Sequence, residues 1–121
     1  MNSKKYVPVL ILIFVLLLVA IVFVPSYLIK RDYDSYCESY KRFLTRASTM
    51  EEAINAVTFA EEVYSQTLMP SANRAFKAIA TADTKQKYEL VRVAARESGY
   101  SDWECPQMKD HLSSLNDETS E

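Results

Sequence analysis

Residues 7–29 read VPVLILIFVLLLVAIVFVPSYLI, and no charged residue lies between Lys5 and Lys30. As an α-helix this run would be about 34 Å long at 1.5 Å per residue, which exceeds the roughly 30 Å hydrocarbon core of a bilayer. Tyr6 and Tyr27 lie near its two ends, where aromatic side chains favour the membrane interface. The run therefore predicts a transmembrane anchor helix.

A cleaved signal peptide is the alternative interpretation of this run. Signal peptides have apolar cores of about 7–15 residues, followed by small residues at the cleavage site. The core here is longer, and its exit over residues 22–27 reads VFVPSY, without an Ala-x-Ala motif. We therefore expect an uncleaved anchor over residues 6–29, preceded by a short cytoplasmic tail over residues 1–5.

Two cysteines bear on the compartment of the remaining chain. Cys37 follows the anchor and Cys105 lies near the C-terminus, and the chain has no other cysteine. An even pair that brackets a small domain predicts a disulfide in an oxidising compartment, whereas two unrelated buried thiols in a cytosolic domain are the alternative. Lysines and arginines flank the run on both sides, so the positive-inside rule alone gives a weak signal. We expect a single-pass protein of a bacterial inner membrane, with its N-terminus cytoplasmic and its C-terminal domain periplasmic.

Residues 30–112 are predicted to form one all-α domain, a bundle of four or five short helices clamped by the disulfide. The chain has a single glycine, Gly99, which argues against hairpin-rich β structure and against glycine-rich phosphate-binding loops. Apolar residues recur at helical spacing instead, and the length suffices for one modest core. Residues 113–121 are polar and acidic and are predicted to be a disordered tail.

Local signals predict where these helices begin and end. The first soluble helix is expected to start at a cap at Asp32 or Asp34, and continuation from the anchor with a kink at Pro25 is the alternative. Overlapping capping boxes in residues 48–52 predict the start of the second helix. Gly99 predicts the left-handed stop of the fourth, and Asp102 is expected to cap the last one.

Apolar residues spaced by three and four indicate which side of each helix faces the core. The first soluble helix carries a stripe of Tyr33, Tyr36 and Tyr40. Such a stripe is typical of a core, and a ligand-binding or partner-binding role is the alternative. The second helix is expected to bury its apolar residues, which are Met50, Ile54, Val57, Ala60, Tyr64 and Leu68.

Charge is divided between the helices. The formal net charge of the chain is −2, which gives no case for the clustered basic surface that binds nucleic acid. Glutamates make the second helix acidic, whereas the next two helices are basic. Complementary surfaces within one bundle explain this division, and a docking face for an acidic partner or for lipid headgroups is the alternative. The basic residues are Arg74, Lys77, Lys85, Lys87, Arg92 and Arg96.

The sequence lacks the residue patterns of common catalytic and metal sites. His111 is the only histidine, and with two cysteines it cannot complete a zinc site of the usual four ligands. The chain has no Cys-x-x-Cys and no Gly-x-Ser-x-Gly. A thiol nucleophile at Cys37 or Cys105 beside His111 is the alternative. We therefore expect no metal, no cofactor and no enzymatic activity.

The segment from Lys87 to Met108 contains Tyr88, Ala94-Ala95, Glu97, Gly99 and the Trp103-x-Cys105-Pro106 motif. With these residues it resembles a small group of bacterial membrane-anchored helical envelope proteins. The resemblance covers about a quarter of the chain and carries no assigned activity and no functional residues.

These patterns predict a non-enzymatic accessory or interaction protein that contacts the bilayer through residues 6–29 and a protein partner in or at the membrane. A periplasmic inhibitor, immunity or lysis-control protein is the second hypothesis, because a small anchored domain suits the capture of one incoming partner. A thiol-based enzyme is the third.

Overall fold

The computed structural model describes residues 3–119, and every regular element in that range is helical. The elements in chain order are helices α1 (Ser3–Arg46), α2 (Glu52–Gln66) and α3 (Pro70–Ala80), the short 3₁₀ helix η1 (Thr84–Gln86), and helices α4 (Lys87–Glu97) and α5 (Pro106–Thr119). The all-α class predicted from the sequence is confirmed.

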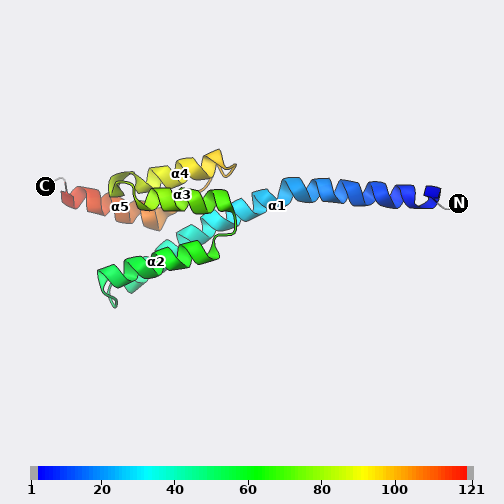
Figure 1. The fold of residues 1–121 in the computed structure, drawn as a ribbon. Coiled ribbons are helices and arrows are strands. Elements are labelled where there is room, and N and C mark those ends of the chain that lie inside the picture. Colours follow the sequence, from blue (N-terminus) through cyan, green and yellow to red (C-terminus); the bar gives the residue numbers. More distant parts are fainter. Residues whose placement is uncertain (1–2, 120–121) are drawn as a thin grey trace.

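Helix α1 is a single rod of 44 residues, about 66 Å long. Its N-terminal part projects away from the other helices, and its C-terminal part forms one wall of the bundle (Figure 1). Side chains from Lys4 to Tyr27 are exposed, and by length and composition this stretch could cross a membrane. Burial begins at Ile29, so the apolar segment and the bundle share one continuous helix.

Helix α1 remains helical through Pro25 and on to Arg46, so the predicted helix start at Asp32 or Asp34 is wrong, and the first soluble helix continues from the anchor. Residues 26–46 contain neither glycine nor proline. The buried tyrosines of this segment continue one stripe along the helix, which gives its packing no point of interruption.

Asp32 has a different role from the one predicted. It is only 1% exposed in the middle of α1. Its carboxylate accepts hydrogen bonds from the backbone N–H groups of Leu68 at 2.9 Å and Met69 at 2.7 Å. These donors lie directly before α3, so Asp32 stabilises the entry to that helix instead of capping its own.

The predicted capping boxes at residues 48–52 do not form. Helix α2 has Glu51 at its N-cap position, with no side-chain hydrogen bond to the helix. The backbone N–H groups of Thr49 and Met50 both donate to the carbonyl of Arg46 at 3.0 Å. Residues 48–50 therefore belong to the turn that closes α1.

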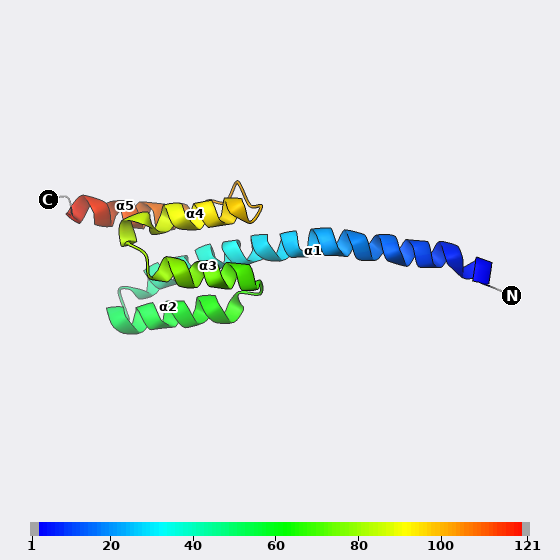
Figure 2. The same cartoon turned by 45° about the horizontal axis from the view of Figure 1, so that its top comes forward.

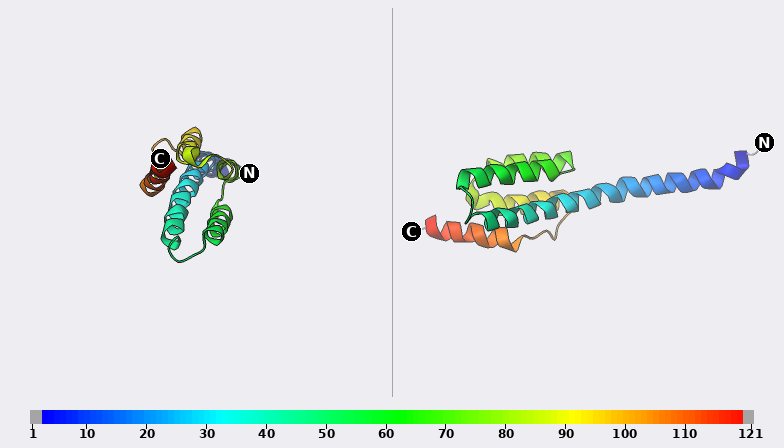
Figure 3. Two further views of the ribbon diagram at one scale, coloured as in Figure 1. Left: turned by 90° about the vertical axis from the view of Figure 1, so that its left-hand side faces the viewer. Right: turned by 90° about the horizontal axis from the view of Figure 1, so that it is seen from below.

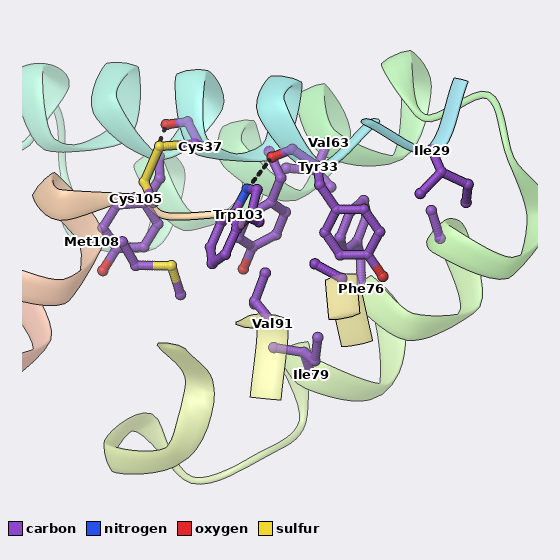
Figure 4. Packing of buried hydrophobic residues seen from close by; sticks show 14 of the residues in the cluster. Ile29, Tyr33, Cys37, Val63, Phe76, Ile79, Val91, Trp103, Cys105 and Met108 are labelled. Atoms are coloured by element: carbon purple, nitrogen blue, oxygen red, sulfur yellow. Dashed lines mark hydrogen bonds between the residues drawn. A yellow bond between two sulfur atoms is a disulfide. The ribbon is translucent and has the colours of Figure 1, made fainter. Parts of the chain in front are cut away.

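The main core fills the space between α1 and helices α3, α4 and α5, which lie side by side with it (Figure 2). Trp103 and Tyr33 are buried, and the indole Nε1 of Trp103 donates to the carbonyl of Tyr33 at 3.0 Å (Figure 4). Phe76 lies edge-on to Tyr33, with 5.0 Å between ring centroids. Other buried members of this core are Ile79, Val91, Ala95, Met108 and Leu112.

The Cys37–Cys105 disulfide predicted from the sequence is present, with a Cα–Cα distance of 5.7 Å. It joins α1 to the segment before α5, beside Trp103 and Met108 (Figure 4). Because the two cysteines are 68 residues apart, the bridge would stabilise the fold by about 4 kcal/mol in the chain-entropy model.

Gly99 ends α4 as predicted. Its φ is +99°, the left-handed region that favours glycine. The N–H of Tyr100 donates to the carbonyl of Ala95 at 2.8 Å, and the N–H of Gly99 donates to that of Arg96 at 3.0 Å. This pair of bonds is a Schellman motif.

The last helix differs from the prediction at both ends. It starts at Pro106 instead of near Asp102, and it continues to Thr119, although a disordered tail was expected from Ser113. Met108, Leu112 and Leu115 recur at spacings of four and three and pack on the core, which gives the helix an apolar side beyond residue 112. The last two residues of the predicted tail lie outside the described range.

Candidate interaction surface

Helix α2 packs against α1 through an aromatic contact of Phe59 with Tyr36 and Tyr40, and through a set of charged and polar side chains. The carboxylate of Glu62, which is 21% exposed, accepts hydrogen bonds from Nε of Arg42 and, at 3.2 Å, from Nη1 of Arg46. The hydroxyl of Ser39 donates to the same carboxylate at 3.3 Å. Glu62 therefore accepts hydrogen bonds from three side chains of α1, and water screens its ion pairs with the two arginines only in part.

Amide side chains extend this polar contact along α2. Asn55 is 1% exposed; it accepts from Nε of Arg46 at 3.0 Å and donates to the carbonyl of Phe43 at 2.9 Å. Near the other end, Gln66 donates to the carbonyl of Ser35 at 3.2 Å. Since buried polar groups require partners, these bonds determine which side of α2 faces α1.

Some apolar residues of α2 face outward, whereas Phe59, Val63 and Tyr64 pack on the core. Ile54 and Val57 of α2 are 54% and 58% exposed, and Leu68, which follows the end of α2, is 52% exposed. These values correct the prediction that the three residues line the core. The small residues Ala53 and Ala56 are exposed beside them. We call these five residues the α2 face. An apolar outer side is the reverse of the usual amphipathic arrangement of a bundle helix.

A sequence signal for this orientation exists. Asn55, Glu62 and Gln66 are separated by seven and four residues, which places them on one side of a helix. Arg42 and Arg46 offer partners on α1. The polar side of α2 is periodic too, but the larger size of the apolar residues makes them the stronger sequence indicator of a core.

An aromatic groove of about 250 Å³ adjoins the α2 face. It lies between α2 and α3, with α1 as its floor, and α2 is set apart from α4 and α5 in the end-on view (Figure 3, left). Tyr36 stacks on Phe76 with 4.7 Å between ring centroids, and lies edge-on to Phe59 at 5.6 Å. The lining residues are Tyr36, Tyr40, Phe43, Ala56, Phe59, Ala60, Val63, Tyr64, Phe76, Ala80 and Lys87. Because Ala56 belongs to both, the groove and the α2 face form one apolar surface.

The predicted tyrosine stripe belongs to the core and also contributes to the groove. Tyr33, Tyr36 and Tyr40 are all buried, and the last two line the groove. Burial raises the pKa of Tyr36, and it raises the pKa of Tyr40 to about 12. The hydroxyl of Tyr40 lies 2.6 Å from Nδ1 of His111 on α5. Both tyrosines are therefore neutral hydrogen-bonding groups at neutral pH.

The six basic residues predicted to form a partner face are divided in the structure. The Nζ atom of Lys77 lies 5.6 Å from the ring centroid of Tyr64, and Lys87 lines one end of the groove. The other four are exposed and do not line the groove. Among them, Arg92 forms an ion pair with Glu89 at 2.5 Å. These four are Arg74, Lys85, Arg92 and Arg96. The structure therefore brings two of the six cations to the aromatic groove.

The residues considered for catalysis occupy structural positions. The disulfide uses both sulfur atoms, so neither Cys37 nor Cys105 has a free thiol beside His111. Within residues 3–119, no three His, Cys, Asp or Glu side chains gather in a geometry that could hold a metal ion. The continuous apolar surface is thus the feature from which a function can be argued.

Comparisons of the chain with protein-family models, with curated proteins and with solved structures give no match.

Proposed function

We propose that this protein is a non-enzymatic interaction protein, or accessory subunit, of a bacterial inner membrane. The apolar part of α1 anchors it with the N-terminus in the cytoplasm and the bundle in the periplasm. The observation that carries the proposal is the α2 face, in which Ile54 and Val57 of α2 and Leu68 just after it are each more than half exposed to solvent. A contiguous exposed apolar surface on a small domain is typical of a site that another molecule covers.

The shape of α1 supports the anchor. Tyr6 and Tyr27 are 60% and 67% exposed and are about 32 Å apart along the helix. That spacing matches the hydrocarbon thickness of a bilayer with an aromatic ring at each interface. The Cys37–Cys105 bridge supports the periplasmic side, because cytosolic thiols are kept reduced.

A thiol-labelling gel on intact membranes tests the compartment. A maleimide mass tag is added with and without prior reduction, and the shift of the full-length chain is recorded. We expect Cys37 and Cys105 to be labelled only after reduction. Labelling of both cysteines without reduction would place the bundle in a reducing compartment and overturn the periplasmic location.

Mass measurement in a mild detergent tests the interaction. The full-length chain is extracted from its native membrane, and the protein mass of the particle is compared with the 13.9 kDa of one chain. We expect a complex. A lone monomer under conditions that preserve membrane complexes would contradict the proposed function.

A further inference from the structure

The aromatic groove between α2 and α3 has the size and the lining of a site for a small ligand. Its volume of about 250 Å³ exceeds the roughly 150 Å³ of an apolar cavity that holds benzene, and approaches the roughly 300–1,000 Å³ of typical ligand pockets. Six of its eleven lining residues are tyrosine or phenylalanine. Because aromatic rings pack favourably edge-to-face or offset against another ring, the groove suits an aromatic ring with a short substituent.

One charged side chain belongs to the lining. Among the described residues that line the groove, Lys87 alone carries a charge, and it is half-buried at the start of α4. Its ammonium group forms no ion pair with any carboxylate within residues 3–119. The start of a helix also favours negative charge, because the helix dipole is positive there. An anionic group at Lys87 would therefore gain a charge-assisted contact that the described chain does not supply.

A buried hydroxyl in the same lining also lacks a partner. Tyr36 is 6% exposed, and its ring contacts the rings of Phe59 and Phe76. The hydroxyl of the neighbouring Tyr40 has a partner in His111, whereas the hydroxyl of Tyr36 forms no hydrogen bond within the described part of the chain. Buried polar groups in proteins are seldom left unpaired. An oxygen atom on a ligand in the groove would satisfy this donor.

We propose that the aromatic groove binds a small aromatic hydroxy acid. The ring of the ligand lies against the aromatic lining, and its carboxylate pairs with the ammonium group of Lys87. The hydroxyl of Tyr36 donates a hydrogen bond to the hydroxyl oxygen of the ligand. This inference goes beyond the proposed function, since a ligand in the groove leaves Ile54 and Val57 exposed for a protein partner.

Calorimetric titration of the full-length chain in nanodiscs tests the site, and empty nanodiscs provide the blank for partitioning into lipid. The probes are p-hydroxycinnamate and its neutral amide. We expect saturable binding of the acid at one site per chain. The dissociation constant of the amide should be about tenfold larger, because the amide cannot form the charged contact. No saturable heat above the blank, or equal affinity for acid and amide, would overturn the proposal.

Substitutions of Lys87 separate its charge from its packing. Lys87→Gln should raise the dissociation constant of the acid about tenfold and leave that of the amide unchanged, whereas Lys87→Arg keeps the cation and should bind the acid like the parent chain. Lys85→Gln is the matched control, because Lys85 is exposed on η1 and does not line the groove. Equal weakening of acid and amide by Lys87→Gln would overturn the ion pair.

Tyr36→Phe tests the hydrogen bond, because it keeps the ring and removes the hydroxyl. It should raise the dissociation constant of p-hydroxycinnamate about threefold and leave that of cinnamate, which has no hydroxyl, unchanged. Equal losses for the two acids would overturn the hydrogen bond.

An aliphatic acid tests the class of ligand. Octanoate should bind more weakly than p-hydroxycinnamate, because it has no ring to pack against the aromatic lining. Tighter binding of octanoate would overturn the aromatic ligand. Absence of all binding, with a larger complex still present in detergent, would overturn this inference alone and leave the proposed function intact.

Discussion

The two sides of the soluble part of α1 are packed in opposite ways. Toward α3, α4 and α5 it presents Tyr33, which is fully buried against Phe76 and Trp103. Toward α2 it presents Arg42 and Arg46, which hold Glu62, Asn55 and, through neighbouring residues, Gln66. One side is dry and aromatic, and the other combines the aromatic contact around Phe59 with a network of charges and amides.

This difference teaches that the stability of the bundle is concentrated on one side. Burial of a large apolar side chain contributes roughly 1.5–3 kcal/mol, whereas a partly exposed ion pair contributes about 1 kcal/mol or less. On the α2 side, polar residues orient the helix and Val63 is buried, but Ile54 and Val57 remain exposed. The following substitutions test this division of roles, starting with the largest expected effect.

Trp103→Ala should lower the free energy of unfolding by about 3–5 kcal/mol, because it leaves a cavity and removes the indole donor of the Tyr33 carbonyl. Denaturant titration of the full chain in detergent, followed by far-UV ellipticity, measures it. The control is Val57→Ala on the α2 face, which should change monomer stability by no more than about 0.5 kcal/mol. Similar losses in both variants would mean that the two sides are equally packed.

Reduction of the Cys37–Cys105 bridge should have the next largest effect, a loss of about 2–4 kcal/mol, because the unfolded chain is no longer restrained. The bridge lies on the aromatic side, so amide hydrogen exchange should accelerate most in α5 and less in α2. A Cys37→Ser/Cys105→Ser double variant controls for the reductant. Equal acceleration in α2 would show that both sides open as one cooperative unit.

The aromatic side could be predicted from the sequence to a large extent. Three of its features follow from local patterns or from the only possible pairing of two residues. They are the tyrosine stripe of α1, the left-handed Gly99 and the bond between the two cysteines. Each depends on one helix period, one conformational requirement or one pair of residues. The structure confirms all three.

The α2 side could not be predicted in the same way. Both sides of α2 are periodic, and the choice between them depends on which residues α1 presents at that position. Asp32 shows the same difficulty, because its partners at Leu68 and Met69 are more than thirty residues away and its own position resembles a helix cap. Such decisions belong to tertiary packing, which overrides local propensity.

Alkaline pH tests the place where the two sides meet. Tyr36 contacts Phe59 of α2 and Phe76 of α3, and burial raises its pKa, as it raises the pKa of Tyr40 to about 12. In the unfolded chain the tyrosines ionise near pH 10. The contribution of Tyr36 and Tyr40 to the free energy of unfolding is therefore fully present below pH 10. It should fall by about 1.4 kcal/mol per pH unit for each such tyrosine as the pH rises toward 12. Urea titrations at pH 9 and pH 11 measure this slope.

A Tyr36→Phe variant provides the matched comparison for the alkaline experiment. It keeps the ring and removes the ionisable hydroxyl, so it should lose less stability between pH 9 and pH 11 than the parent chain. An unchanged slope would mean that other groups cause the alkaline loss.

Glu62→Gln should have the smallest effect of the series, a loss of about 1 kcal/mol, since the amide retains the shape but loses both guanidinium pairs. The neighbouring Glu61→Gln is the matched control. Glu61 is exposed on α2, so its substitution should leave stability unchanged. Two adjacent glutamates then separate the polar contact with α1 from an exposed charge on the same helix. If both variants lost the same stability, or neither lost any, the guanidinium pairs of Glu62 would not be what holds α2 against α1, and the exposure of Ile54 and Val57 would need another cause.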